Sequence, residues 1–592
     1  FRGTHRSEGS SVAIKVLDIE GFSNERTRQE FRRELLASAR LNHPNIAMLV
    51  DAGTVPDLVP SSAPEVIRPG AYWIATDYVE GTLLNESPSR HTWSTFEPLL
   101  VQLLDALAHA HALGVVHRDI KQSNVIVADS PAGSVGELKL VDFGIAHAFD
   151  DDPGSDDHGT GLTVQGTPLY MAPEQALSSW REQGPWTDLY AVGCLVWWIV
   201  CRKPPFQGLT SVDTIEAHLK EKLPPFRPHI SVPDGLEAWL SRLLEKAPAR
   251  RYRRAADALV DLERLATVDE PASETPAPVS DVAPTIVEPQ IFAASRTLTR
   301  LHDTRHDVRA VDEPAGGRLG RAGEPFPGWQ RPGGTVHPKQ LPGAGMLLFE
   351  QRVRPLVGLE AQRERIWGAL ESTIRAGRAR AVLVRGEAGT GKSRLVRWLA
   401  TRSHELGLTI NLRAEHDPQG GPLSGLGAML ARFFRAEGLE PTELFEHVRR
   451  TMRQTVGDDA SIEQDAAALA SLMLRSRTGE NSAASTFEFD SQFQQFEVMT
   501  RFLRGLSQRR PLLVVLDDLH WDGDSTEWFH HILTRGADIP VLLVATMAPD
   551  AALTEEPHVR RVMEASRRDE ARTIELDPLH PEPWLRLLDA RR

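Results

Sequence analysis

Two short segments in the first quarter of the chain carry side chains suited to phosphate chemistry. Asp119 and Asn124 lie within the run HRDIKQSN, and Asp142 follows in the tripeptide DFG. Phosphoryl transfer needs a carboxylate that orients the attacking hydroxyl and oxygen ligands that hold Mg²⁺. Asp119 is therefore the candidate base, and Asn124 and Asp142 are the candidate Mg²⁺ ligands.

A lysine and a glutamate upstream could hold the phosphates of a nucleotide. Lys15 lies in the strand-like run VAIK, and Glu34 lies on the helical pattern RQEFRRELLASARL that follows. We predict that Lys15 contacts the α- and β-phosphates of ATP and that Glu34 holds this lysine by an ion pair. Glu30, on a neighbouring turn of the same face, is the competing partner.

A glycine-rich run in the second half of the chain provides another candidate phosphate site. The stretch AVLVRGEAGTGKSRLVRWLA has the pattern of a strand, a loop and a helix, and it contains G-x-x-x-x-G-K-S. In such a loop backbone amides surround the phosphates, the lysine reaches the β- and γ-phosphates, and the serine ligates Mg²⁺. The residues concerned are Gly386, Gly389, Gly391, Lys392 and Ser393.

An apolar run farther along ends in two carboxylates. The segment PLLVVLDD is typical of a buried strand, and it closes with Asp517 and Asp518. We predict that one carboxylate, Asp517, supports Mg²⁺ together with Ser393, and that Asp518 supports a hydrolytic water.

These side chains need elements to position them, and the patterning predicts two folded domains of different class. Residues 1–268 show short β-rich runs followed by long amphipathic helical patterns, which indicates a small β-lobe ahead of a helical lobe. Residues 269–345 are rich in Pro and Gly and are predicted to be a disordered linker. Residues 346–592 alternate strands and helices, which predicts an α/β domain with a parallel sheet.

The composition disfavours several classes of protein. A net charge of −14, from 67 basic and 81 acidic residues, argues against a chain that coats nucleic acid or anionic lipid. The two cysteines, Cys194 and Cys201, leave no disulfide framework, so a cytoplasmic location is expected. The apolar run over residues 189–201 is shorter than the roughly 18 residues that span a bilayer, and it predicts a buried core helix.

The first domain carries several known motifs in order: VAIK, LNHPNI, TDYVEG, HRDIKQSN, DFG and GTPLYMAPE. On these motifs, residues 1 to about 265 resemble a bacterial eukaryotic-like serine/threonine protein kinase domain. The resemblance implies the bilobal α+β kinase fold, and it implies that Lys121 stabilises the transferred phosphate. The ATP-binding residues that it adds are Ala13, Thr76 as gatekeeper, and Asp77 and Val79 in the adenine hinge.

The same resemblance assigns supporting roles to other residues of this domain. Asp188 would brace the catalytic loop, and Glu174 would pair with Arg251. Arg118, directly before Asp119, is typical of kinases in which a phosphate orders the activation segment.

The activation segment contains the candidate acceptors for such a phosphate. An acidic run, FDDDPGSDDHGTG, precedes LTVQGTPLYMAPE, and Thr163 and then Thr160 are the predicted phosphoacceptors. Thr167 is expected to bond the catalytic loop instead.

The second domain resembles the STAND class of ATPases within the AAA+ superfamily. The motifs are LVGLE, GEAGTGKS and LLVVLDDLHW. Leu359 stands where the family usually has Arg, and Ala548 stands where the next strand typically ends in a sensor-like Arg. From these two differences we predict that nucleotide binds, that its hydrolysis is slow, and that it acts as a conformational signal.

Together the motifs predict a signalling kinase that uses ATP and Mg²⁺ to phosphorylate Ser and Thr of protein substrates. The fused ATPase would regulate it and would contact signalling partners; no membrane span or nucleic-acid binding is expected. The alternative is an ATP-driven switch or scaffold with a weak or inactive kinase module. Only fourteen residues precede Lys15, so we expect the Gly-rich loop over ATP to lie before Phe1 and the chain to continue beyond Arg592.

Overall fold

Two units make up the fold, and each has its own hydrophobic core. The first holds the predicted kinase motifs and the second holds the glycine-rich phosphate loop, so the multi-domain prediction is confirmed. The computed structural model describes residues 1–5, 9–17, 25–57, 64, 67–84, 92–128, 136–143, 168–177, 179–265, 325–330, 348, 356, 358–421, 423–457, 461–478, 487–548 and 571–576.

An antiparallel sheet in the order β1-β2-β4-β3 forms the small lobe of the first unit. In the pairing of β2 with β4, Ala13 lies opposite Thr76 and Lys15 lies opposite Ile74. Because side chains alternate along a strand, this register puts all four residues on one face of the sheet. The strands are β1 (Arg2–Thr4), β2 (Ser11–Leu17), β3 (Leu49–Thr54) and β4 (Tyr72–Asp77), and helix α1 (Glu25–Ser38) follows β2.

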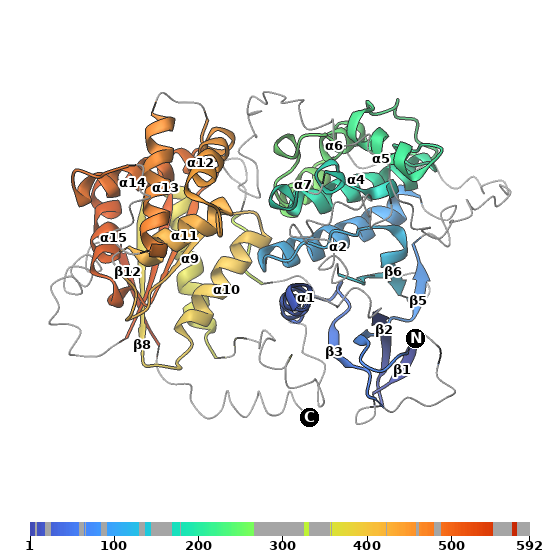
Figure 1. Ribbon diagram of the computed structural model, residues 1–592, viewed down its shortest axis with the longest axis horizontal. Helices are drawn as coiled ribbons and strands as arrows, with labels where there is room; N and C mark the ends of the chain where they lie inside the picture. The colour runs from blue at the N-terminus through green and yellow to red at the C-terminus, as the bar shows by residue number, and fades with distance from the viewer. Residues whose placement is uncertain are drawn as a thin grey trace. The chain divides into compact units, whose positions relative to one another are not determined.

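The larger lobe is helical and surrounds one long apolar helix, α4 (Pro185–Cys201). Leu189 and Trp197 of α4 are fully buried, so the predicted core helix is confirmed. Figure 1 shows this helix among the other helices of the lobe. The remaining elements are β5 (Gly81–Leu83), α2 (Trp93–Ala112), β6 (Val125–Ala128), β7 (Glu137–Leu140), α3 (Pro173–Ala176), α5 (Ser211–Lys220), α6 (Leu236–Leu243), α7 (Ala255–Glu263) and the short 3₁₀ turns η3 (Gln122–Asn124), η5 (Pro168–Tyr170), η6 (Trp180–Glu182) and η7 (Pro248–Arg250).

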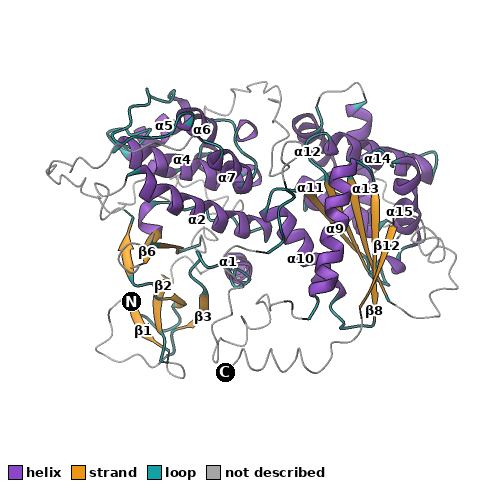
Figure 2. Cartoon of the chain, turned by 180° about the vertical axis from the view of Figure 1, so that it is seen from behind, coloured by secondary structure: helices purple, strands orange, loops and turns teal. Residues whose placement is uncertain are grey.

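A parallel sheet in the order β12-β8-β11-β10-β9 forms the centre of the second unit. Both faces are buried, since Leu513 and Val515 pack with α9 and α10 while Leu512 and Val514 pack with helices on the other face. Figure 2 shows the strands in orange with helices around them. The elements are α9 (Glu360–Ala376), β8 (Arg380–Gly386), α10 (Lys392–Glu405), β9 (Ile410–Glu415), α11 (Ser424–Phe434), α12 (Pro441–Thr455), α13 (Ile462–Thr478), α14 (Gln492–Ser507), β10 (Leu512–Asp517), η9 (Leu519–Trp521), α15 (Gly523–Arg535), β11 (Val541–Met547) and β12 (Ala571–Leu576).

A short piece of the predicted linker belongs to the second unit. Residues 325–330 lie within the range 269–345 that we predicted to be disordered, but Phe326 and Trp329 pack against the core formed by α9, α10 and the sheet. The composition of this segment hid its aromatic anchors, because Pro and Gly around them give no periodic pattern.

Leu348 was assigned to the second domain from the sequence, but it packs in the first unit. Leu348 lies in the range 346–592 that we assigned to the ATPase domain, yet it is 1% exposed in a cluster of the small lobe. Its neighbours there include Leu17 of β2 and Phe31 of α1. The sheet of the first unit therefore receives an apolar side chain from beyond its last helix.

Within the parts of the chain that the structure describes, no helix is both long and apolar enough to cross a bilayer.

Candidate functional site

A cleft of about 400 Å³ opens on the face of the small sheet that carries Lys15. The register described above brings Ala13, Lys15 and Thr76 to it, and Asp142 reaches it from the DFG motif. Asp77 and Val79 follow Thr76 along the chain; Asp77 is tied to Met48, whose N–H donates to its carboxylate at 3.3 Å. The lining residues are Phe1, Ala13, Ile14, Lys15, Val16, Ile74, Thr76 and Asp142.

The ion pairs in this cleft differ from the predicted Lys15–Glu34 pair. Lys15 Nζ lies 3.1 Å from Asp142 Oδ2, and Arg118 Nη1 lies 2.8 Å from Glu34 Oε1. The attraction between opposite charges increases as their distance decreases, and the cation in contact with Glu34 is Arg118 rather than Lys15. The structure thus corrects the predicted partner of Glu34.

The catalytic-loop residues form one connected group. Lys121 Nζ lies 2.7 Å from Asp119 Oδ2, and the Asn124 amide nitrogen donates to Asp119 Oδ2 at 3.0 Å and to the Asp119 carbonyl at 2.8 Å. These contacts fix the Asp119 carboxylate and leave the amide oxygen of Asn124 as its ligand atom. The structure therefore brings the proposed base, the phosphate-stabilising lysine and one metal ligand together.

A buried aspartate from α4 holds this loop in place. Asp188 accepts the backbone N–H of His117 at 2.8 Å and that of Arg118 at 2.7 Å, and its Oδ2 lies 2.8 Å from His111 Nε2. Burial acts to raise the pKa of Asp188, but the hydrogen bond from His111 and the nearby histidines outweigh it and hold the pKa below its ordinary value. A charged Asp188 can therefore brace a loop in which Arg118 adopts a φ of 65°.

His117 is buried and links the loop to the DFG motif. Burial lowers its pKa, against the charge of Asp188, so the neutral ring is favoured. Its Nε2 lies 3.0 Å from the Val141 carbonyl, and its ring packs 4.6 Å from that of Phe143. This contact keeps Phe143 in the core while its neighbour Asp142 points into the cleft.

The predicted Glu174–Arg251 pair is formed deep in the larger lobe. Arg251 donates to both carboxylate oxygens of Glu174, at 2.8 and 2.9 Å, and both side chains are almost fully buried. Thr187 of α4 donates to the same carboxylate at 2.8 Å. Three elements are thereby joined through one carboxylate.

Some predicted residues lie outside the described part of the chain. They are Thr160, Thr163 and Thr167 of the activation segment, Val357 of the LVGLE motif, and the side chain of Glu30.

The glycine-rich loop of the second unit joins β8 to α10. Gly389 and Gly391 adopt φ values of 83° and 98°, which residues other than glycine rarely reach. A side chain at Gly386 would meet the Leu576 carbonyl at 2.6 Å. Lys392 Nζ donates to two carbonyls of the loop itself, Gly386 at 2.8 Å and Glu387 at 2.9 Å. The loop therefore has the open backbone that phosphate needs at a helix N-terminus.

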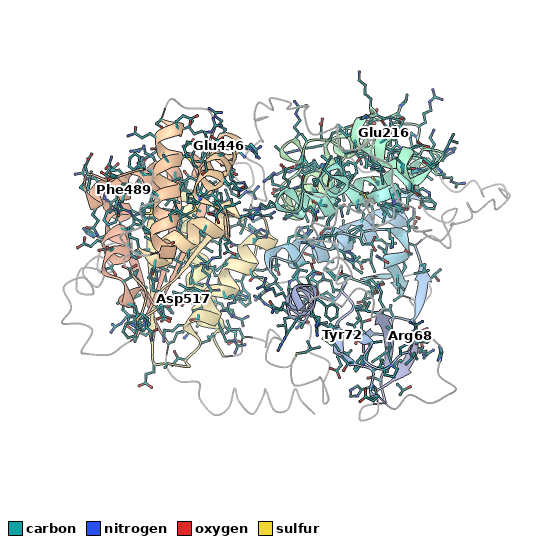
Figure 3. The ribbon with its side chains drawn as sticks, viewed as in Figure 1. Arg68, Tyr72, Glu216, Glu446, Phe489 and Asp517 are labelled. Carbon is teal, nitrogen blue, oxygen red and sulfur yellow. The ribbon has the colours of Figure 1, made fainter. Side chains whose placement is uncertain are left out.

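Asp517 lies at the carboxyl end of β10, where Figure 3 labels it. Its Oδ1 accepts hydrogen bonds from Ser393 at 3.0 Å and from Thr546 at 2.7 Å, and its Oδ2 accepts one from Arg413 at 3.0 Å. The hydroxyl and the carboxylate are hard oxygen donors from the two predicted metal ligands, and they fit Mg²⁺. Among the described residues, no cluster of three or more His, Cys, Asp or Glu is placed to hold a metal ion.

Sequence reasoning missed Thr546. Its hydroxyl donates to Asp517 and accepts the backbone N–H of Asp518 at 2.8 Å, which fixes the turn where Asp518 has a φ of 53°. The sequence pattern pointed to Ala548 instead, which lies just after β11. A polar residue inside the apolar run VLLVATM was the available signal.

The folds and sites define two classes of domain: a bilobal domain with a phosphotransferase-type catalytic loop, and an α/β domain with a phosphate loop followed by an acidic strand end. The family models agree, since the protein kinase domain model matches residues 1–261 and the AAA ATPase domain model matches residues 355–544. The chain therefore carries a match to the protein kinase domain in its first unit and a match to the AAA ATPase domain in its second.

Similar proteins match over the kinase part. Serine/threonine-protein kinase pkn3 of Myxococcus xanthus is 37% identical over 276 residues, which cover 45% of this chain and 47% of that protein. Serine/threonine-protein kinase PknA of Mycobacterium tuberculosis is 34% identical over 276 residues, 46% of this chain and 59% of the relative. The chain thus matches only about half the length of these curated relatives.

Proposed function

We propose that the first unit is a serine/threonine protein kinase that transfers the γ-phosphate of ATP to protein hydroxyls. The observation that carries this is the group of Asp119, Lys121 and Asn124, joined by contacts of 2.7 to 3.0 Å beside a cleft that holds Lys15 and Asp142. The relatives named as serine/threonine kinases support the choice of acceptor.

In the proposed transfer, each side chain has a step of its own. Asp119 orients the acceptor hydroxyl and takes its proton as the oxygen attacks the γ-phosphorus and the bond to ADP breaks. Lys121 neutralises charge on the transferred phosphate, and Lys15 holds the α- and β-phosphates. Mg²⁺, held by Asn124 and Asp142, would supply further charge neutralisation.

The ion pairs indicate a resting state that must rearrange before transfer. Glu34 is paired with Arg118 at 2.8 Å, and Lys15 is paired with the proposed metal ligand Asp142 at 3.1 Å. A dianionic phosphate on the activation segment would compete with Glu34 for Arg118, because a guanidinium binds phosphate by two parallel bonds. Release of Glu34 would then let it pair with Lys15.

We further propose that the second unit is a STAND-type regulator that binds ATP and Mg²⁺ through Lys392, Ser393 and Asp517. Support comes from the 3.0 Å contact between the Ser393 hydroxyl and Asp517, and from the match of this unit to the AAA ATPase domain model. Signalling partners would act through this unit. Two buried free thiols, Cys194 and Cys201, favour a cytoplasmic location.

One substitution tests the kinase proposal. Asp119→Asn keeps the shape of the side chain but removes the proton acceptor, so we expect phosphate transfer to a generic protein substrate to fall at least about 100-fold. Glu216→Gln, on an exposed carboxylate of α5, is the matched control and should be silent. Equal phosphate transfer by the two variants would favour the alternative, a scaffold with an inactive kinase module. So would the absence of transfer by the unsubstituted protein.

A further inference from the structure

A peptide segment that precedes the ATPase domain in the chain is docked on its surface. Trp329 packs edge-on against Trp398 of α10, with ring centroids 5.5 Å apart, and Phe326 packs against Trp367 of α9 at 5.9 Å. Trp367 and Trp398 are themselves 6.1 Å apart. We call residues 325–330 the clip. Its two aromatic anchors bridge α9 and α10.

Polar contacts hold the backbone of the clip in one position. The Trp367 indole donates to the Pro327 carbonyl at 3.1 Å, and Arg402 donates to the Trp329 carbonyl at 2.9 Å. The Trp329 indole donates to Glu364 at 2.7 Å. Arg402 is also paired with Glu405 of the same helix at 2.9 Å, and this pair holds the donor toward the clip. The surface is therefore built to hold a peptide.

The first turn of α9 connects the clip to the phosphate loop. Arg363 stacks over the Trp329 ring at 4.4 Å and donates its backbone N–H to the Leu359 carbonyl at 2.8 Å. The Leu359 side chain in turn lies beside the loop, since a Cβ at Gly391 would meet it at 3.6 Å. One helical turn thus separates the clip from the phosphate site.

Helix α10 provides a second connection. It begins at Lys392, the cation of the phosphate loop, and it also carries Trp398 and Arg402, which contact the clip. Phosphate bound at its N-terminus and a clip bound along its length both restrict the same helix. Two ligands that order the same element bind with positive cooperativity.

We propose that the face of α9 and α10 is a peptide-docking surface whose occupant is the clip, and that ATP at the phosphate loop tightens this docking. The coupling is reciprocal, so loss of the clip weakens ATP binding by the same factor by which ATP strengthens the clip. The inference rests on the ATP binding proposed for the second unit, which the titration of the phosphate-loop peptide measures separately, and it does not depend on kinase activity.

Hydrogen exchange of the full chain tests the first half of the coupling. We expect saturating ATP with Mg²⁺ to slow exchange in the peptide that contains residues 325–330 by at least about fivefold. The effect should vanish in Lys392→Ala, which lacks the cation of the phosphate loop. ATP-dependent protection that persists in Lys392→Ala, or no protection in the unchanged chain, overturns the proposal.

The reciprocal half uses the ATP titration of exchange in the loop peptide over residues 386–393, which reports this site alone in the intact chain. We expect Trp329→Ala to raise the ATP concentration at the midpoint of this titration. The increase should equal the factor by which ATP slows exchange in the clip. Glu364→Ala, an exposed position, should raise it less, and Gln330→Ala, whose side chain is exposed, should leave it unchanged. If Trp329→Ala lowers the melting temperature but leaves the ATP-titration midpoint unchanged, the clip has only a structural role. This result overturns the coupling.

Discussion

The reactive side chains of both sites depend on residues that touch no phosphate. Asp188 fixes the backbone of His117 and Arg118, and Thr546 fixes both Asp517 and the turn at Asp518. Arg118 and Asp518 have positive φ values of 65° and 53°, which cost free energy for residues with a side chain. Hydrogen bonds to Asp188 and Thr546 thus support strained backbone beside the candidate reacting groups.

Thr546 is a positioning residue, and its isosteric replacement tests this role. In Thr546→Val the carboxylate of Asp517 and the N–H of Asp518 lose a partner, so we expect ATP hydrolysis by the second unit to fall about tenfold or more. ATP affinity should change by less than about threefold, because Lys392 and the loop amides remain. The measurement uses an Asp119→Asn background to remove kinase turnover, and Thr546→Ser, which keeps the hydroxyl, is the control. Unchanged turnover in Thr546→Val would contradict the role.

The Glu34–Arg118 pair leads to a prediction about phosphorylation. Thr163, and next Thr160, should carry phosphate in active protein, and Thr163→Ala should lower the activated rate by about tenfold or more because Arg118 then stays with Glu34. Mass spectrometry of active protein locates the phosphate. Phosphate found only in residues 269–345 would count against this mechanism.

The motifs predicted candidate site residues but not the side chains with which these residues pair. The types and spacing of Asp119, Asn124 and Ser393 were enough to predict roles, because phosphate chemistry needs those groups in that order. The sequence could not show that Glu34 forms its ion pair with Arg118 and not with Lys15, since neither cation is its neighbour along the chain. The choice between two reachable cations depends on tertiary geometry.

At the scale of elements, a buried ion pair joins three parts of the larger lobe. Glu174 at the start of α3 accepts from Arg251, which follows η7, and from Thr187 of α4. Arg251 also donates to the carbonyls of Glu245 and Lys246, at 2.6 and 3.0 Å. Such a fully bonded pair fixes the position of the segment that ends the activation loop.

Removal of one partner should therefore destabilise the kinase lobe strongly. We expect Arg251→Ala to lower the free energy of unfolding by about 3–5 kcal/mol, because it leaves a buried carboxylate without its cation. Lys220→Ala is the control. Its partner Glu216, labelled in Figure 3, is about half exposed, and such a pair contributes less than about 1 kcal/mol. Urea unfolding followed by circular dichroism compares the two; equal midpoints would sink the prediction.

The predicted elements agree with the structure where the hydrophobic pattern was clear over several residues. The apolar runs PLLVVLDD and PVLLVAT became β10 and β11, because strands of a parallel sheet are buried on both faces and show as continuous apolar runs. The clip was missed, since a six-residue segment in which prolines flank Phe326 and a glycine precedes Trp329 resembles a linker. Its docking depends on the surface of α9 and α10, which no local pattern reveals.

At the scale of the whole molecule, the proposed functions imply two nucleotide sites on one chain. Lys392→Ala removes the cation of one site only, so we expect calorimetric titration of the full chain to change from two bound ATP molecules to one. Lys15→Ala should remove the other. A full loss of binding in Lys392→Ala would show that the two sites are not separate.

Leu348, buried in the small lobe, divides the covalent connection between the domains into unequal parts. The 17 residues 331–347 lie between Leu348 and the clip, which packs on the second unit, and the 11 residues 349–359 lie between Leu348 and the start of α9. The burial of one leucine thus leaves covalent connections between the domains that are much shorter than the 77-residue linker predicted over residues 269–345.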